Sequence, residues 1–376
     1  MNMSNQRIIT QRRGWLSALA TSALGLVTPP ASANRGTAKT VSPTSAPKQL
    51  DLVTAWTKNF SGMTQSLDRF ASRVYELSEG SLRIRWAHQD QANMSALDLL
   101  DAVAAGKIDM AHSTSYYWTR RSVGFNFFAT LPFGMLPNEH YAWLRYGGGL
   151  ALWQKLAAQH GVHVLPCGNT GVQMGGWFRE RLHSIDDLKG LKIRYPGIGG
   201  EIFKRMGAIP TMLPASELRA ALGDGRLDAA EWVSPWGDLD LEMHTVANHY
   251  YFPGIHEPGH TLELLINPSV WSGLTAHQRK VIETVSWLEF SDMHGMLNHE
   301  NARALQDMMK LPKVQVLRFP NDIITQYRKL TPKVIEDAVS HDATAQTIWK
   351  SYSTYMRQQM RWAELSDRAY WQARYQ

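Results

Sequence analysis

The sequence predicts an α/β protein of two similar lobes, with one long helix spanning both lobes and further helices at the C-terminus. Three observations lead to this fold class. A helix, a glycine and a short apolar strand follow one another twice, around Gly106–Ala111 (GKIDMA) and Gly225–Ala230 (GRLDAA). Residues 276–309 keep a helical spacing of apolar side chains. The chain has 376 residues, enough for two domains with their own cores.

The N-terminal residues 1–33 have the pattern of an export signal. The basic pair Arg12-Arg13 precedes an apolar stretch, Trp15 to Val27, that is too short to span a bilayer, and Ala31-Ser32-Ala33 is a small-residue cleavage site. The arginine pair directly before the apolar stretch indicates the twin-arginine export route. Residues 34–48 are rich in Ser, Thr, Pro and Ala, which predicts a disordered linker. We therefore expect the mature protein to be soluble and outside the cytoplasm.

Charge and cysteine content exclude several classes of protein. The net charge of +6 includes the arginines of the signal segment, and no basic block of the kind that nucleic acid requires is present. The single cysteine, Cys167, has no partner for an internal disulfide, and a buried, inert thiol is its default state. Packing rather than cross-linking is therefore expected to stabilise the fold.

The first lobe is predicted over residues 49–166, completed by residues 258–275. Its elements are a strand at 50–56, a helix at 67–77, a strand from Leu82 to Trp86, a helix capped by Ser95, and a strand from Ile108. Gly106 closes the helix that Ser95 begins.

The second lobe is predicted over residues 167–257. Within it, Leu191 to Arg194 alternate as a short strand, which Pro196-Gly197 closes as a turn. Ser216 is expected to cap the helix of the repeated unit, and residues 227–233 to form its strand.

The long helix and the C-terminal helices follow both lobes. Thr275 caps the long helix, and residues 310–376 contribute helices at about 322–339 and 344–374, the second rich in Trp, Tyr and Arg. This last helix is expected to pack on the rest of the protein or to mediate association. A homodimer is therefore one assembly that the sequence predicts. One face of the long helix is predicted from Val281, Ile282, Val285, Leu288, Met296, Leu297 and Leu305.

Candidate binding residues lie where strands end. In open α/β sheets ligands bind beyond the carboxyl ends of strands, which here are 112–118 and 231–236. Arg194 also ends a strand, and a guanidinium gives a carboxylate two parallel charge-assisted hydrogen bonds. Gln173, Glu231 and Glu257 offer hard oxygen atoms, which suit Na⁺ or Ca²⁺ better than zinc. For each of them a surface group or an ordinary structural hydrogen bond is the alternative, and for Arg194 it is a surface ion pair with a neighbouring Asp or Glu.

Two motifs point to other chemistry. His256-Glu257-Pro258-Gly259-His260 matches H-E-x-x-H, so a secreted zinc metalloprotease is the enzyme alternative. That chemistry needs both histidines on one continuous helix, and Pro258 with Gly259 opposes such a helix. The glycine run 197–200 lacks the features of a phosphate loop and is predicted to form ordinary turns.

Longer runs of the sequence match a known family over most of residues 50–300. On these runs the sequence resembles the solute-binding proteins of TRAP (tripartite ATP-independent periplasmic) transporters, DctP-like proteins, in particular the branch that binds α-keto acids and other small carboxylates. The matching runs are TSYYW (Thr114–Trp118), LPFG (Leu131–Gly134), YGGGLALW (Tyr146–Trp153), GNTGVQMGGWF (Gly168–Phe178), DDLKGLKIR (Asp186–Arg194), LDAAEWVSP (Leu227–Pro235) and YYFPG..EPG (Tyr250–Gly259).

The resemblance implies a periplasmic binding protein fold whose lobes close on a ligand. It implies a non-catalytic periplasmic protein that captures a small 2-oxo or 2-hydroxy acid and delivers it to the permease subunits of a TRAP transporter. Arg194 would clamp the ligand carboxylate, and Gln173, Tyr117 and Trp232 would contact the ligand. No organic cofactor is implied.

The resemblance also implies a cation that bridges ligand and protein. Its ligands would be Gln173, Glu231 with the carbonyl of Trp232, and Glu257. The sequence departs from the family near the pocket, where Ile255-His256 stands in place of the usual aromatic residues.

Overall fold

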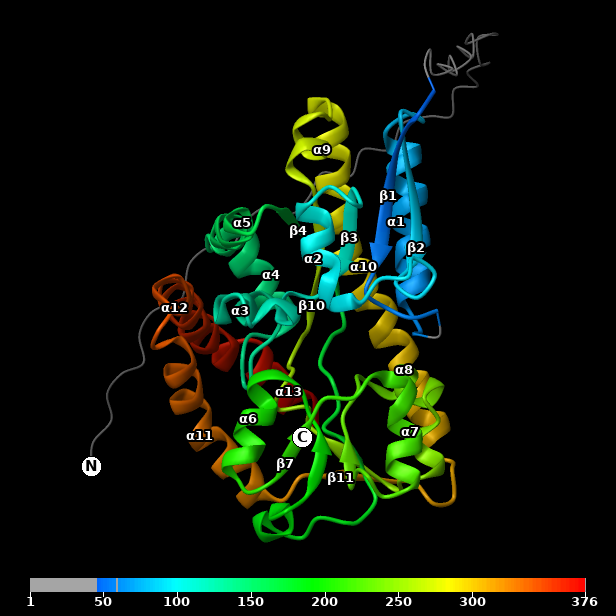
Figure 1. Ribbon diagram of the computed structural model, residues 1–376. Coiled ribbons are helices and arrows are strands. Elements are labelled where there is room, and N and C mark those ends of the chain that lie inside the picture. Colours follow the sequence, from blue (N-terminus) through cyan, green and yellow to red (C-terminus); the bar gives the residue numbers. More distant parts are fainter. Residues whose placement is uncertain (1–45, 59, 376) are drawn as a thin grey trace, which may run out of the picture. The chain divides into compact units, whose positions relative to one another are not determined.

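The structure is a computed structural model that describes residues 46–58 and 60–375 (Figure 1). The predicted signal segment, residues 1–33, and residues 34–45 of the predicted linker lie outside the described residues. Lys48, the last residue of that linker, is instead the first residue of strand β1 (Lys48–Thr54), which begins before the predicted start at residue 50.

The first lobe is built on a five-stranded mixed sheet in the order β2-β1-β3-β10-β4. Strand β1 runs parallel to β2 and β3, and β10 lies antiparallel between β3 and β4. In the sequence, β10 lies between two strands of the second sheet, β9 and β11. The chain therefore crosses between the two sheets more than once. The other strands are β2 (Leu82–His88), β3 (Met110–Ser113), β4 (His163–Asn169) and β10 (Thr261–Ile266).

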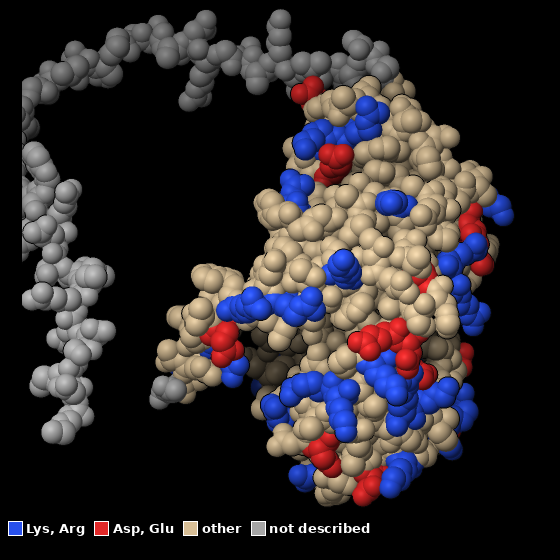
Figure 2. Space-filling model, turned by 90° about the vertical axis from the view of Figure 1, so that its left-hand side faces the viewer, with Lys and Arg blue, Asp and Glu red and all other residues tan. Residues whose placement is uncertain are grey.

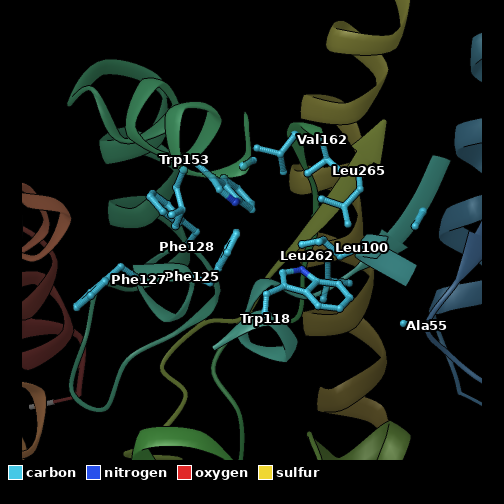
Figure 3. Close-up of a cluster of buried hydrophobic side chains, with 14 of the residues drawn as sticks. Ala55, Leu100, Trp118, Phe125, Phe127, Phe128, Trp153, Val162, Leu262 and Leu265 are labelled. Atoms are coloured by element: carbon cyan, nitrogen blue, oxygen red, sulfur yellow. The ribbon is translucent and has the colours of Figure 1, made fainter. Parts of the chain in front are cut away.

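Helices pack on both sides of this sheet and on one another. Those of the first lobe are α1 (Met63–Leu77), α2 (Leu99–Ala104), α3 (Asn126–Ala129), α4 (Pro137–Tyr146), α5 (Gly149–Gln159) and α9 (Pro268–Ser272). Their core is rich in aromatic side chains: Phe128 stacks on Trp153 with ring centroids 5.2 Å apart and on Trp143 at 5.5 Å (Figure 3). Trp118 belongs to the same buried cluster.

The second lobe is built on a six-stranded mixed sheet in the order β11-β9-β5-β8-β6-β7. Its strands are β5 (Gly176–Phe178), β6 (Lys192–Arg194), β7 (Ile209–Thr211), β8 (Ala229–Ala230), β9 (His249–Phe252) and β11 (Gln315–Arg318). Its helices are α6 (Gly197–Arg205), α7 (Ala215–Gly223) and α8 (Pro235–Asp240). Strand β11 comes from the C-terminal segment and pairs in parallel with β9, which the sequence did not predict.

The repeated unit occurs in both lobes, as α2 with β3 and as α7 with β8. Gly106 (φ 69°) and Gly225 (φ 81°) both adopt the left-handed conformation that favours glycine at a helix end. Two details of the second copy are corrected. Ser216 lies inside α7, whose N-cap is Pro214. Strand β8 is much shorter than the predicted 227–233, because the chain leaves the sheet after Ala230 to enter the interlobe cavity described below.

Helix α10 (Ala276–Met308) confirms the predicted long helix, and it packs against β4 and α1 of the first lobe and against α8 of the second (Figure 1). Thr275 caps it, since its hydroxyl accepts from the Gln278 backbone N–H at 3.1 Å. The predicted apolar face is wrong at Leu288, which is 39% exposed. The buried residue beside it is Glu289, paired with Arg69 and Arg73 of α1.

The C-terminal helices divide between the lobes. Helix α11 (Asn321–Val339) packs on α6, and α12 (Ala343–Leu365) packs on α4 and α5. The predicted single helix at 344–374 is two helices, because Ser366 leaves the helical conformation (ψ −95°) before α13 (Asp367–Tyr375). Among the described residues, no helix combines the length and the hydropathy that a membrane span requires.

Candidate functional site

The four predicted site residues with polar side chains, Gln173, Arg194, Glu231 and Glu257, line one cavity, and the predicted Trp232 lines it as well. The cavity also contacts Trp56 and other side chains of the first lobe, so it lies between the two lobes. The centres of water-sized molecules can occupy a volume of about 30 Å³ in it. The space therefore suits only a small ligand.

Arg194 ends strand β6 and is held rigidly in this cavity. Its Nη1 donates to the Glu231 carbonyl oxygen at 2.6 Å and to Glu231 Oε2 at 2.8 Å. Its guanidinium carbon lies 5.1 Å from the ring centre of Trp232. Only 4% of Arg194 is exposed, and its Nε–H has no hydrogen-bond partner. A buried guanidinium with a free donor is prepared for an oxygen anion. The pairing with Glu231 is buried, not the surface ion pair of the alternative reading.

Two buried oxygen atoms of the site have no donor. Gln173 donates through Nε2 to Thr170 Oγ1 at 3.2 Å, while its Oε1 has no partner. Glu231 Oε1 lies 3.3 Å from His256 Nε2, but the geometry is not that of a hydrogen bond. Both residues are almost wholly buried. Buried polar atoms without partners are rare because each costs free energy, so these oxygens indicate a missing positive partner.

Glu257 supplies the second carboxylate. It lies in the loop between β9 and β10, and its Oε2 accepts from His260 Nδ1 at 2.7 Å. Burial alone would raise the pKa of Glu257, but His260, His256 and Arg194 together lower it below its ordinary value. Glu257 is therefore an anion at neutral pH.

These oxygens fit a hard cation and not a transition metal. Gln173 Oε1, Glu231 Oε1 and the Glu257 carboxylate would hold Na⁺ or Ca²⁺, and the Trp232 carbonyl belongs to the same strand end. Across residues 46–58 and 60–375, no three His, Cys, Asp or Glu side chains gather as a metal site. A cation here would therefore depend on the carboxamide and on oxygens of a bound ligand.

The H-E-x-x-H motif does not form the helix that zinc chemistry requires. Residues 256–260 lie in an extended loop, in which His256 bonds the Tyr195 hydroxyl at 2.8 Å and His260 bonds Glu257. Their partners are different, so the two histidines do not share a face. The predicted turn at 197–200 is also corrected: it forms the first turn of α6, directly after β6.

Of the two neighbouring tyrosines, Tyr116 and not the predicted Tyr117 lines the cavity, together with Trp56, Phe60 and Trp232. Tyr117 lines an adjoining groove of about 350 Å³, together with Arg194 and Trp232. Both tyrosines lie in the 3₁₀ turn Ser115–Trp118, and neighbouring positions in such a turn face different ways. Sequence reasoning missed Tyr116, Trp56 and Phe60, although the strand-end rule would have included Trp56, which follows β1.

A buried carboxyl group anchors this tyrosine turn to the sheet. Glu263 of β10 accepts hydrogen bonds from the Ser115 hydroxyl and from Trp118 Nε1. Burial raises the pKa of Glu263 to about 7, although both hydrogen bonds act in the opposite direction. The protonated acid is therefore the form that this site favours.

Replacing Glu263 by Gln is expected to flatten the pH dependence of stability. The folded protein binds the Glu263 proton more tightly than the unfolded chain does. Its contribution is therefore complete below about pH 4 and is lost as the pH rises to about 7, by up to about 3 kcal/mol. Thermal unfolding of both proteins from pH 4 to pH 8 measures this. The variant should lose less stability across that range, and equal pH profiles would contradict the assignment.

Comparison with known proteins finds relatives over most of the chain. A monocarboxylate 2-oxoacid-binding periplasmic protein of Nostoc sp. is 33% identical over 85% of this chain and 87% of its own length. Two crystal structures of TRAP periplasmic solute-binding proteins are each 36% identical and cover 87% of this chain and 99% of their own. The one from Colwellia psychrerythraea, with bound calcium and pyruvate, has a TM-score of 0.84, and the one from Pseudoalteromonas atlantica, with bound sodium and pyruvate, has 0.82.

The family assignment rests on most of the chain. Residues 53–342, from within β1 to the start of α12, match one family of transport proteins. Both sheets, the long helix and all four cavity residues lie inside this match. The chain therefore belongs to the DctP family, the bacterial extracellular solute-binding proteins of family 7.

Proposed function

We propose that this chain is the periplasmic receptor of a TRAP transporter and that it captures a small 2-oxo or 2-hydroxy acid for the membrane permease subunits. One observation carries the proposal: a buried arginine with a free donor and two unpartnered buried oxygens meet in one small cavity. An arginine attracts the acid's carboxylate, and the oxygens attract a cation. Few small molecules can bind the arginine and the cation at the same time.

Each of these residues has its own proposed role in binding. Arg194 orients the ligand carboxylate. Gln173, Glu231 and Glu257, with the Trp232 carbonyl, would hold Na⁺ or Ca²⁺, which offsets the negative charge that the ligand brings to two carboxylates. A 2-oxo acid has a second oxygen next to its carboxylate that can complete the shell of the cation. Nothing in this arrangement activates a nucleophile, so the ligand is released unchanged.

The surfaces that close over the ligand come from both lobes. We propose lobe boundaries at residues 49–166 with 258–275 and at 167–257, although β4 continues to Asn169. Lobe closure would then bring Arg194 of one lobe against Trp56 and Tyr116 of the other.

A thermal-shift panel of small acids tests the function. Pyruvate, lactate and 2-oxobutyrate, each with Ca²⁺ or Na⁺, are expected to raise the melting temperature by several degrees at saturation, because a ligand bound only by the folded state stabilises it. Methyl pyruvate, which lacks the carboxylate, is the matched control and should give no shift. Recovery of the acid unchanged would separate binding from turnover. The proposal fails if no acid shifts the transition, or if the ester shifts it equally.

The C-terminal helices support a second proposal, a homodimer. The end of α12 and α13 expose large apolar side chains, including Trp362 (65%), Leu365 (78%) and Tyr370 (65%). Exposed patches of this kind mark association surfaces. Lys and Arg side chains gather on the lower part of the neighbouring face, with Asp and Glu side chains among them (Figure 2).

The mass in solution tests the dimer, measured by light scattering at 0.15 M salt, where repulsion between basic faces is screened. The dimer is expected for the wild type and the monomer for the double variant Trp362→Ser/Leu365→Ser. A monomeric wild type would contradict this proposal.

A further inference from the structure

A second, smaller cavity adjoins the binding cavity. Tyr116, Pro196 and Glu257 line both cavities, so the two spaces adjoin at these residues. The second cavity is completed by Thr130 of the first lobe and by His256 and residues 197–199 of the second. Its open volume of about 20 Å³ for water-sized centres is room for about one oxygen-sized group.

The walls of this second cavity carry polar atoms without partners. His256 is 2% exposed; its Nδ1 bonds the Tyr195 hydroxyl, while Nε2 has no hydrogen bond in spite of its 3.3 Å approach to Glu231. Thr130 Oγ1 is also buried without a partner. Several unpaired polar atoms at one small space indicate a hydrogen-bonding group that belongs there.

Gly199, which lines this space, is closely packed. A Cβ on Gly199 would lie 3.0 Å from the Tyr327 hydroxyl and 3.0 Å from His256 Cβ. A larger residue at this position would therefore displace His256 or Tyr327.

Helix α6 adds donors to the same cavity. Its nine residues begin at Gly197, and its N-cap, Pro196, provides no side-chain acceptor. The first N–H groups of a helix have no partner within the helix, and the helix dipole favours negative or electron-rich atoms there. The cavity therefore has an excess of donors, which an oxygen acceptor satisfies.

The second cavity favours a hydroxyl over a second carboxylate. Its volume admits about one oxygen-sized group, so a second carboxylate does not fit. A hydroxyl can accept from the helix end, Thr130 or His256 and donate to the Glu257 carboxylate. Its size also matches the available room.

We propose that the second cavity binds a hydroxyl group on the carbon next to the 2-oxo carbonyl, so that the preferred ligands are 3-hydroxy-2-oxo acids. This inference rests on the proposed function, since it places the carboxylate and the 2-oxo group in the first cavity. The hydroxyl reaches the second cavity past Tyr116 and Glu257.

Calorimetry with two probes tests the subsite: pyruvate and 3-hydroxypyruvate, which differ only in this hydroxyl. The wild type is expected to bind 3-hydroxypyruvate about tenfold more tightly, as one added buried hydrogen bond of about 1.4 kcal/mol gives. Thr130→Val has nearly the same shape but no hydroxyl. It should weaken 3-hydroxypyruvate binding severalfold and change pyruvate binding less than twofold. Thr211→Val, at an exposed position of β7, is the matched control and should change neither affinity.

The outcomes separate the subsite from the function. Equal affinities of the wild type for the two acids would overturn the subsite and leave the proposed function standing. Equal losses for both acids in Thr130→Val would do the same, since the cavity would then hold only structural water. Absence of binding of either acid would overturn both the subsite and the proposed function.

Discussion

Arg194→Ala is expected to lower the affinity for a small 2-oxo acid by about 30-fold or more. The guanidinium is buried, stacked near Trp232 and fixed by two bonds to Glu231, so it meets the ligand carboxylate without losing further side-chain entropy. Removing one partner of a buried, charge-assisted pair typically costs about 2–5 kcal/mol, which corresponds to this loss or more. Isothermal calorimetry with pyruvate in Ca²⁺ buffer measures it.

The control for this variant must address stability. Arg194→Ala leaves Glu231 buried without its cation, which typically destabilises a fold by about 3–5 kcal/mol. The double variant Arg194→Ala/Glu231→Gln removes both charges and should recover much of that loss without recovering binding. Arg194→Lys keeps the charge but loses the two-pronged geometry, so an intermediate affinity is expected. Wild-type affinity in a folded Arg194→Ala protein would refute the carboxylate clamp.

Removing the bridging cation is expected to weaken binding by at least about tenfold. Without it, the ligand carboxylate enters a space that already holds the carboxylates of Glu231 and Glu257, and like charges in a buried site repel strongly. Affinity is measured by calorimetry after dialysis against chelator in Na⁺-free buffer, and again after Ca²⁺ or Na⁺ is restored. Restoring the correct ion should return the affinity.

Gln173→Leu is the cleanest variant for the same question. The Gln173 Oε1 atom has no protein partner, so the variant removes one cation ligand at the cost of a single side-chain hydrogen bond, from Gln173 Nε2 to Thr170 Oγ1. The expected result is a higher cation requirement for pyruvate binding, measured as a shift in the Ca²⁺ titration midpoint. Gln315→Leu, at an exposed position of β11, is the matched control. If affinity is the same with and without cations in the wild type, no cation bridges the ligand.

The pattern of caps and glycines was enough to predict much of the fold. Thr275 with Gln278 begins α10, and Gly106 and Gly225 end the helices of the repeated unit, because capping and left-handed backbone are local properties of the residues involved. Strand β11 could not be predicted in the same way. It is short and half-exposed, and only its pairing with β9 makes it a strand.

The candidate site was likewise predictable in part from local patterns and in part only from tertiary contacts. Arg194 and Glu231 were predicted together because each ends a strand, and the ends of neighbouring parallel strands β6 and β8 lie at one edge of the sheet. The choice between Tyr116 and Tyr117 depended on how their turn is rotated, which the Glu263 anchor decides from a strand about 145 residues later in the chain.

By itself, the sequence determined the chemical character of this protein. The residue types at the strand ends and the capping residues and glycines at the helix ends predict an α/β receptor with an arginine for a carboxylate and oxygen atoms for a cation. Only the tertiary structure decided which of those polar atoms remain without partners, among them Gln173 Oε1, Glu231 Oε1 and His256 Nε2. The physical reason is that hydrogen-bond satisfaction and cavity volume depend on contacts between segments far apart in the chain, which no local pattern encodes.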